Sequence, residues 1–399
     1  MTTHDEKMND RKKMCIEELK AIKVLGRGAM GCVLLVVKNG CHDQPFALKV
    51  IRKNTKDEEW LTKLRRIHRE REILSSLHHP FLPFLMGEVE TDFMVGWASE
   101  YCPGGDLHYL RQIQPDRSFS ESAIRFYAAE IVLALEHLHS QGIVYRDLKP
   151  ENILVQSSGH IMLTDFDLSK RLVPNSNESH ISQNQEQQKK HSLQQRGSWP
   201  VLRRMLSSKA KKPCPSTQVP PALNQSHQKS FLRSNSFVGT DEYVAPEMIK
   251  AEGHEFSVDW WSFGILLYEL LYGTTPFKGS NKKETFNKIL LMNPKLMGPS
   301  TPLHDLILRL LEKNPEKRLG FSHGADEIKR HLFFTGLQWG SIHDVCRPPF
   351  VPNIDSSYYN CTDHLFTSEM ESILHAINIV SVSESEEDQT TDSEVDGLF

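Results

Sequence analysis

Residues 145–152 read Tyr145-Arg146-Asp147-Leu148-Lys149-Pro150-Glu151-Asn152, and residues 165–167 read Asp165-Phe166-Asp167. In-line phosphoryl transfer requires an acid within reach of a substrate hydroxyl, a nearby lysine, and a carboxylate with an amide for Mg²⁺. The two segments supply all of these groups, and the second begins 18 residues after Asp147. Each residue alone also has an ordinary interpretation within a loop or a core, so the rest of the sequence must decide.

A glycine-rich segment lies nearer the N-terminus, between strand-like runs at 21–25 and 32–37. It reads Gly26-Arg27-Gly28-Ala29-Met30-Gly31-Cys32-Val33. Glycine lets a backbone approach phosphates and point N–H groups at them, although glycines also mark ordinary turns. A dinucleotide-binding loop would lead into a helix, whereas residues 32–37 favour a strand, so the segment does not match that motif.

Lys49 lies in a third apolar run, Phe46–Ile51, where a single lysine would usually be a solvated charge at a strand end. Glu70 falls in the charged helical stretch Glu58–Leu77 and could pair with this lysine, holding it against nucleotide phosphates. Two further segments follow in order: Ala245-Pro246-Glu247 and Asp259-Trp260-Trp261-Ser262-Phe263-Gly264. The ordered set favours one shared chemistry over a series of unrelated loops.

Composition excludes several classes of protein. The 399 residues suffice for about two average domains, and 39% hydrophobic with 25% charged residues is an ordinary globular balance. A net charge of −4 argues against a dedicated nucleic-acid binder. No apolar run is long enough to span a bilayer, and the charged residues 1–20 do not resemble a signal peptide. Seven scattered cysteines predict a reducing, intracellular compartment without disulfides or a zinc site.

Two lobes of different composition are expected. Residues 21–101 carry short β-type runs, whereas residues 102–344 are mostly helical. Helices are predicted over Ser120–Gly142, with Ser120 as the N-cap, and over the almost wholly apolar Trp260–Leu271, which should be buried. The sequence therefore predicts an α+β fold, with a β-rich lobe and a mostly helical lobe on either side of a cleft.

Three flanking segments complete the organisation: an N-terminal extension at 1–20, a basic insert at 172–230 and a tail at 345–399. Residues 171–230 hold ten Lys or Arg against two Asp or Glu, are rich in Ser and Gln, and are predicted to be disordered. Residues 381–399 hold seven acidic residues and no basic ones, which indicates a solvated acidic end.

The motifs resemble the set that characterises protein kinases, over residues 21 to about 340. More narrowly, the chain is similar to group VIII of the plant AGC kinases, since Tyr145 replaces the usual histidine and Asp167 the usual glycine. The third shared feature is a long insert: Glu247 follows 82 residues after Asp165, where about 25 suffice. The glycine-rich loop and the tail indicate the oxidative-signal-inducible or UNICORN-like subfamily.

The resemblance implies a bilobal protein-kinase fold and a serine/threonine kinase that uses ATP and Mg²⁺. Asp147 would accept the substrate's hydroxyl proton, Lys149 would neutralise the γ-phosphate, and Lys49, fixed by Glu70, would hold the α- and β-phosphates. Asn152 and Asp165 would hold Mg²⁺. The implied ATP contacts are Leu25, Gly26, Arg27, Gly28, Ala29, Met30, Gly31, Val33, Ala47, Lys49, Glu100, Cys102, Asp106 and Leu154. Glu247 would form a structural pair with Arg318.

The resemblance also assigns regulation and specificity. Ser236 of Ser234-Asn235-Ser236-Phe237-Val238-Gly239-Thr240 occupies the activation-loop phosphorylation position, with Ser234 as the nearby alternative. Arg66, Arg146 and Lys170 would form the basic pocket for that phosphate. Asp106, Glu151 and Glu269 would favour substrates with Arg or Lys upstream of the target residue, unless these acids are only solvated.

Partners and location follow in outline. We expect Ser/Thr-containing protein substrates, no specific nucleic acid and a monomer, in the cytoplasm, at the membrane periphery or in the nucleus. An upstream phosphoinositide-dependent kinase is a candidate activator, although Val395–Phe399 lacks the Phe-x-x-Phe of many relatives. The basic insert has three interpretations: a spacer, a site for anionic lipid or an import signal. The alternative function is a pseudokinase scaffold, which usually lacks at least one of Lys49, Glu70, Asp147, Asn152 and Asp165.

Overall fold

The computed structural model describes residues 13–28, 31–38, 45–53, 60–172, 234, 236, 238–345 and 348–352. Residues 172–233 form a unit separate from the rest of the chain, and all of them except Leu172 lie outside the described residues. The predictions for the basic insert and for the acidic end of the tail also lie outside them. In the described part of the chain, no helix is both long and apolar enough to cross a membrane.

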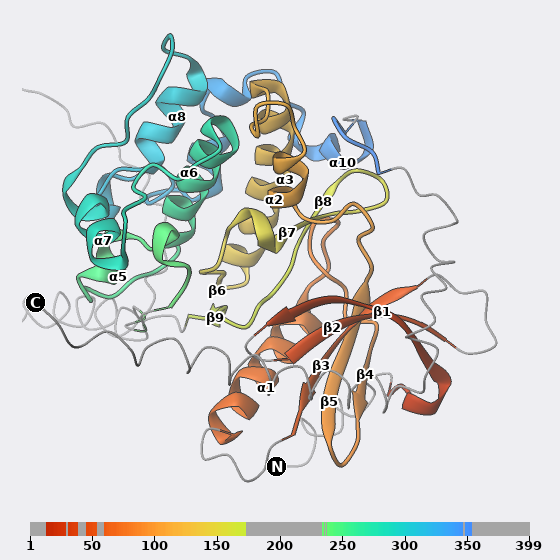
Figure 1. Ribbon diagram of the computed structural model, residues 1–399. Coiled ribbons are helices and arrows are strands. Elements are labelled where there is room, and N and C mark those ends of the chain that lie inside the picture. The colour runs from red at the N-terminus through yellow and green to blue at the C-terminus, as the bar shows by residue number, and fades with distance from the viewer. Residues whose placement is uncertain are drawn as a thin grey trace, which may run out of the picture. The chain divides into compact units, whose positions relative to one another are not determined.

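The β-rich lobe precedes the helical lobe along the chain (Figure 1). The first contains β1 (Leu19–Gly28), β2 (Gly31–Lys38), β3 (Phe46–Arg52), α1 (Trp60–Ser76), β4 (Gly87–Glu90) and β5 (Met94–Glu100). The second contains α2 (Leu107–Gln112), α3 (Glu121–Ser140), β6 (Ile143–Val144), β7 (Ile153–Val155), β8 (Ile161–Leu163), β9 (Lys170–Arg171), α5 (Pro246–Ile249), α6 (Ser257–Tyr272), α7 (Lys282–Leu291), α8 (Pro302–Leu310), α9 (Ala325–Lys329) and α10 (Ile342–Val345). The predicted α+β fold is confirmed.

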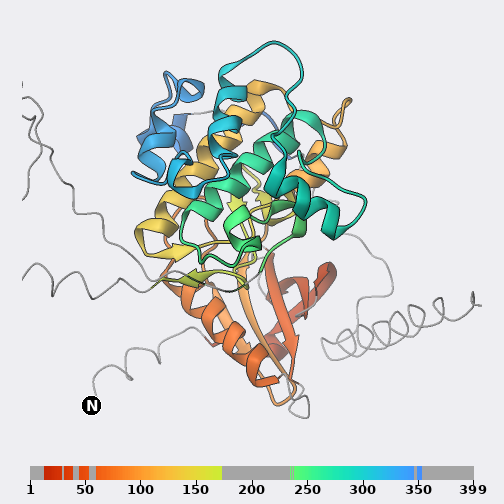
Figure 2. The same cartoon turned by 90° about the vertical axis from the view of Figure 1, so that its left-hand side faces the viewer.

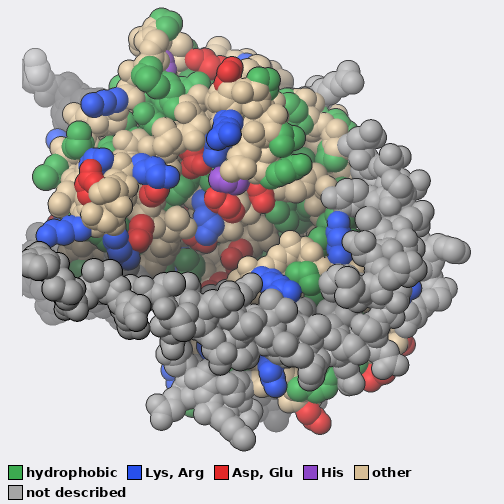
Figure 3. Space-filling model, in the orientation of Figure 1, with side chains coloured by type: hydrophobic (Ala, Val, Ile, Leu, Met, Phe, Trp, Pro, Cys, Tyr) green, Lys and Arg blue, Asp and Glu red, His purple; other side chains and the backbone are tan. Residues whose placement is uncertain are grey.

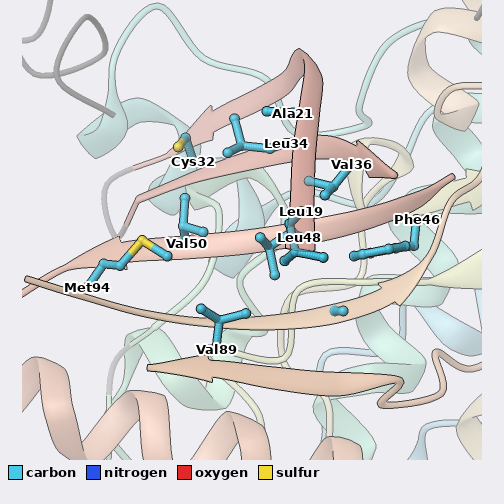
Figure 4. Packing of buried hydrophobic residues seen from close by; sticks show 11 residues of the cluster. Leu19, Ala21, Cys32, Leu34, Val36, Phe46, Leu48, Val50, Val89 and Met94 are labelled. Atoms are coloured by element: carbon cyan, nitrogen blue, oxygen red, sulfur yellow. The ribbon is translucent and has the colours of Figure 1, made fainter. Parts of the chain in front are cut away.

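Strands β1 to β5 form one antiparallel sheet in the order β1-β2-β3-β5-β4. Successive side chains of a strand point to opposite faces, and Phe46, Leu48 and Val50 of β3 all enter the hydrophobic cluster in Figure 4. The intervening Ala47 and Lys49 therefore lie on the other face, where register pairs them with Ser99 and Trp97 of β5. The alternation that builds the core thus aims Lys49 away from it.

Two helices of the second lobe confirm the sequence prediction. The Ser120 side chain accepts a hydrogen bond from the Ala123 N–H at 3.3 Å, capping α3 as expected. In α6 the residues from Ser257 to Leu270 are all buried, because this helix runs through the middle of the helical elements (Figure 1, Figure 2). Its Gly264 faces Leu310 and Leu311 so closely that an added Cβ would lie 2.8 Å from the Leu310 side chain.

The described part of the tail, residues 348–352, packs on the second lobe. The Phe350 ring lies 5.6 Å from the Phe119 ring, measured between centroids. At Gly159, whose φ is +87°, a Cβ would overlap the Phe350 carbonyl oxygen, and at Gly104 it would lie 2.7 Å from Pro352. Glycine at both positions therefore allows the tail to approach the backbone closely.

Candidate active site

A cavity of about 840 Å³ is lined by residues of the sheet and of the helical lobe, which belong to one unit. This volume lies in the usual range for small-molecule and cofactor sites. Apart from Ala29 and Met30, which lie outside the described residues, every residue predicted to contact ATP lines the cavity. They are Leu25, Gly26, Arg27, Gly28, Gly31, Val33, Ala47, Lys49, Glu100, Cys102, Asp106 and Leu154.

The glycines of the β1–β2 hairpin fit a phosphate-bearing ligand. A Cβ added at Gly26 or Gly28 would meet no described atom within 4 Å, and neither residue has a positive φ. Internal packing and backbone conformation therefore do not require glycine at these two positions. At Gly31 a Cβ would overlap the Val50 carbonyl oxygen, so packing does require glycine there. The open space beside Gly26 and Gly28 is consistent with close approach by phosphate groups.

Lys49 has three charged contacts. Its Nζ lies 2.9 and 3.0 Å from the carboxylate oxygens of Glu70 on α1, and 3.0 Å from Oδ1 of Asp165. Burial alone would lower the pKa of Lys49, but the two carboxylates raise it above its usual value, so the ammonium stays charged at neutral pH. The predicted Lys49–Glu70 pair is present.

Trp97 is a further neighbour of Lys49 that the sequence analysis missed. The Lys49 Nζ lies 5.4 Å from the centre of a Trp97 ring, which is a cation–π distance. Cross-strand register places Trp97 on β5 directly opposite Lys49 on β3, and the Trp97 side chain is buried. The sheet therefore holds the stem of the lysine while Glu70 and Asp165 hold its charge.

Asp147 is the centre of a second polar cluster. The Lys149 Nζ lies 2.9 Å from its Oδ2, and the Asn152 Nδ2 donates to the same oxygen at 2.8 Å. The Thr240 hydroxyl donates weakly to Oδ1 at 3.4 Å, and Lys149 also reaches this hydroxyl at 3.2 Å. The structure thus brings together the predicted base, the predicted γ-phosphate lysine and one predicted Mg²⁺ ligand. Thr240 joins them from beyond the insert.

Asp259 of α6 fixes the backbone just before Asp147. Its carboxylate accepts the N–H of Tyr145 at 2.9 Å and that of Arg146 at 2.7 Å, and its side chain is fully buried. Arg146 has a φ of +71°, a left-handed conformation that non-glycine residues adopt rarely. These charge-assisted hydrogen bonds stabilise the strained turn and so orient Asp147.

Asp165 and Asn152 have the chemistry that Mg²⁺ prefers, a carboxylate with an amide oxygen. The Asn152 nitrogen faces Asp147, which leaves the amide oxygen as the atom that can coordinate a cation. The described residues contain no group of three or more His, Cys, Asp or Glu side chains placed to hold a metal. Since Mg²⁺ usually takes only one or two protein ligands and completes its shell with phosphates and water, this donor set fits it.

Asp167 stands where the resemblance places glycine. Its φ is not positive, so its Cβ causes no left-handed strain. Its Oδ2 lies 3.7 Å from a guanidinium nitrogen of Arg66 on α1, and burial raises the pKa of its carboxyl. Arg66 was expected in the phosphate pocket beside Ser236. The ion pair that Arg66 forms in the structure is with Asp167, and its place in the phosphate pocket stays a prediction.

The other two members of that pocket lie as expected. An Arg146 guanidinium nitrogen donates to the Ser236 hydroxyl at 2.5 Å and to the Ser234 hydroxyl at 3.3 Å. The Lys170 Nζ reaches the Ser234 hydroxyl at 3.2 Å. Ser236 is exposed, whereas Ser234 is buried. Of the two serines, Ser236 is therefore the one open to a modifying enzyme.

The three predicted specificity acids differ in their surroundings. Glu151 is half-exposed and lies 3.2 Å from the His108 ring, and Asp106 caps α2 by accepting the Tyr109 N–H at 2.7 Å. Glu269 is buried, with Arg111 on one oxygen at 3.1 Å and the Tyr243 hydroxyl on the other at 2.5 Å. Charged side chains gather in the middle of the described surface in Figure 3. Glu269 thus already has two partners inside the protein, and of the three acids Glu151 is the most open.

Cys32 and Cys102 are free thiols near the cavity. Burial raises the pKa of Cys32 above its usual value and raises the pKa of Cys102 to about 12. Reactive cysteines have a lowered pKa, so both thiols are expected to be unreactive at neutral pH.

Comparison with known proteins gives a consistent result. The family described as "Protein kinase domain" matches residues 19–188 and 222–334. The serine/threonine-protein kinase UCN of Arabidopsis thaliana is 46% identical over 365 residues, which is 84% of each chain. The serine/threonine-protein kinase OXI1 of the same plant is 42% identical over 395 residues, covering 94% of this chain and 88% of that one. Protein kinase PVPK-1 of Phaseolus vulgaris is 44% identical over 375 residues.

Proposed function

The chain belongs to the protein kinase family, as a serine/threonine-protein kinase of the plant AGC type, and from this premise we propose that it is an active signalling enzyme. The family predicted from the sequence is confirmed. The proposed reaction is transfer of the γ-phosphate of Mg²⁺-bound ATP to Ser or Thr hydroxyls of proteins. The observation that carries this proposal is the joint contact of Lys49 with Glu70 and Asp165 beside the Asp147 cluster. Nothing in these residues favours the scaffold alternative.

Each residue has a part in the proposed mechanism. Lys49, held by Glu70, binds the α- and β-phosphates, and the apolar cavity around Val33 and Ala47 binds the adenine ring. Asp147 orients the substrate hydroxyl and accepts its proton as the oxygen attacks the γ-phosphorus, while Lys149 neutralises charge on the transferred group. Asp165 and Asn152 would hold Mg²⁺, which when bound neutralises charge on the phosphates.

Removal of the metal tests this proposal. Wild-type protein is expected to transfer label from γ-³²P-ATP to a basic Ser peptide in Mg²⁺, and to lose at least about 100-fold of that rate in EDTA because the phosphate charge is then unscreened. The peptide with Ala in place of Ser controls for label bound without transfer. Equal incorporation with and without Mg²⁺ would contradict the proposal.

We further propose that substrates carry Arg or Lys upstream of the target residue. Glu151 supports this, because it is the most open of the three predicted specificity acids and carboxylate–guanidinium contacts are charge-assisted. Glu151→Gln is expected to raise KM for an Arg-containing peptide about 3- to 10-fold, a modest effect because the contact is partly screened by solvent. The peptide lacking that Arg should show no such change.

A matched exposed glutamate, Glu316→Gln, controls for the loss of one negative charge far from the cavity. An unchanged KM for Glu151→Gln on both peptides would remove Glu151 from substrate recognition.

Regulation is proposed to act through phosphorylation of Ser236, by this kinase or by an upstream phosphoinositide-dependent kinase. The exposed hydroxyl beside Arg146 supports Ser236 as the acceptor. A monomer that acts in the cytoplasm, at anionic membrane surfaces or in the nucleus remains our proposal for its setting. Spacer, lipid-binding and import functions of the basic insert remain separate predictions.

A further inference from the structure

Ser234 and His254 form an isolated antiparallel bridge beside the predicted phosphate pocket. The Ser234 N–H donates to the His254 carbonyl and the His254 N–H to the Ser234 carbonyl, both at 2.9 Å. Residues directly opposite in such a pair project their side chains on the same side. The His254 ring therefore projects on the side where the Ser234 hydroxyl meets Arg146 and Lys170.

The His254 ring is only 3% exposed, and its buried Nε2 has no hydrogen-bond partner in the described part of the chain. Burying a polar nitrogen without a hydrogen-bond partner costs free energy. We therefore expect this nitrogen to have a ligand or a function. Burial, followed by the cation of Arg146, lowers the pKa of His254 to about 4, which keeps the ring neutral at physiological pH. Lys170 acts in the same direction, whereas Asp259 and Glu247 oppose it.

Among the described residues, the two carboxylates that act on His254, Asp259 and Glu247, already have other partners. Burial and the charges of Arg146 and Arg69 lower the pKa of Lys170, and burial lowers the pKa of Arg146 to about 10. Asp259 is engaged by backbone N–H groups and by His139, and Glu247 by Arg318. A dianion placed between Arg146 and Lys170 would relieve this repulsion and supply an acceptor for His254.

We propose that His254 is a ligand of the phosphate on Ser236, a further basic group of the pocket beside Arg146 and Lys170. The Ser236 hydroxyl lies 3.1 Å from the Ser234 hydroxyl, which sits between Arg146 and Lys170 on the side of the bridge where the His254 ring projects. Phosphorylation forms the bond from Ser236 Oγ to phosphorus, breaks the bond from phosphorus to ADP and releases the hydroxyl proton. His254 then takes a proton from solvent and donates to the dianion. This inference rests on the proposed regulation through Ser236.

The pH dependence has a definite sign. Without phosphate, neutral His254 has a folded pKa below its unfolded value of about 6.5, so its contribution to stability is lost as pH falls towards 4. A phosphate dianion favours the charged ring and raises that pKa. Stabilisation by the phosphate should therefore grow as pH falls from 8.5 to 6.5, above the second pKa of phosphoserine at about 6.

A thermodynamic cycle tests the proposal. Phosphoserine is installed at position 236 of the full chain during translation, in wild type and in His254→Gln, so no kinase activity is needed. Phosphorylation is expected to raise Tm by about 2–6 °C less in His254→Gln than in wild type at pH 6.5, with a smaller difference at pH 8.5. His304→Gln, a buried histidine of α8, serves as the matched control and should leave the gain unchanged.

Equal gains in Tm on phosphorylation in wild type and in His254→Gln would overturn the proposal. If His254 were merely structural, its replacement would lower Tm equally with and without the phosphate on Ser236. If His254→Gln does not fold, the wild-type protein alone still tests the proposal. A gain in Tm on phosphorylation that becomes smaller from pH 8.5 to 6.5 contradicts a histidine ligand. Failure here leaves phosphoryl transfer untouched, because that activity is measured separately on unmodified protein.

Discussion

Asp147→Asn is expected to lower kcat for peptide phosphorylation by about 10²–10⁴-fold, the range for loss of a general base, while KM for ATP changes little. Asparagine keeps the size of the side chain and can still accept from Asn152 and Lys149, which contact Asp147 at 2.8 and 2.9 Å. It cannot accept the substrate's proton. The measurement is steady-state kinetics on a Ser peptide, with Tm as a check on folding.

The control for this substitution is Asp92→Asn, which makes the same chemical change at an exposed position of the β4–β5 turn. It should retain wild-type kcat. An Asp147→Asn enzyme with kcat within about threefold of wild type would mean that Asp147 neither orients the hydroxyl nor accepts its proton.

Arg318→Met is expected to destabilise the fold by about 3–5 kcal/mol, because it leaves the Glu247 carboxylate charged and unpaired in the core. The guanidinium donates to both Glu247 oxygens, at 2.6 and 2.9 Å, and the two side chains are 0% and 2% exposed. It also lies 5.1 Å from the Trp261 ring. A loss of this size should lower Tm by about 6–20 °C in thermal unfolding.

Two further variants separate burial from charge. Arg309→Met breaks a surface pair with Asp305 that is 59% and 46% exposed, and it should change stability by less than about 0.5 kcal/mol. The double variant Glu247→Leu/Arg318→Met removes both charges and should recover part of the loss. A single Arg318→Met variant with wild-type Tm would show that the pair does not stabilise the fold.

The parts of the fold predicted from sequence are those with strong periodicity or fixed spacing. The apolar β-type run Phe46–Ile51 located β3, and the apolar helix predicted at Trp260–Leu271 was found within α6, whose residues are buried on every side. Motif spacing identified Lys49, Asp147 and Asp165. In these cases the pattern lies within a single element or motif, so the sequence of that segment alone was enough to locate it.

The missed features depend on contacts between distant segments. Trp97 meets Lys49 only through the β3–β5 register, and nothing near residue 97 in the sequence indicates a charge opposite it. The ion pair between Arg66 and Asp167 joins α1 to a segment about 100 residues further along the chain, and no local pattern indicated it. His254 comes beside Ser234 through a single bridge between two positions 20 residues apart, both after the insert. Long-range pairings of this kind carry no local signal.

Glu269 shows a further limit of assigning a role to a residue from its matching position in a related family. The acid occupies the expected position, yet Arg111 and Tyr243 already engage both of its oxygens. Sequence identifies the residue type but not the partners, which come from α2 and from the segment after the insert. The open Glu151 is therefore the stronger candidate for reading a basic substrate.

The most direct test of the central claim is transfer of label from γ-³²P-ATP to a Ser peptide by wild type and by Asp165→Asn. Asp165 contacts Lys49 at 3.0 Å and is the proposed carboxylate ligand of Mg²⁺, so its neutralisation should abolish transfer while Asp92→Asn retains it. Phosphoserine in the wild-type product, and none above background with Asp165→Asn, is the predicted result. No transfer by wild type even when Ser236 carries phosphate, or equal transfer by Asp165→Asn, would contradict the assignment of this cavity as the catalytic site.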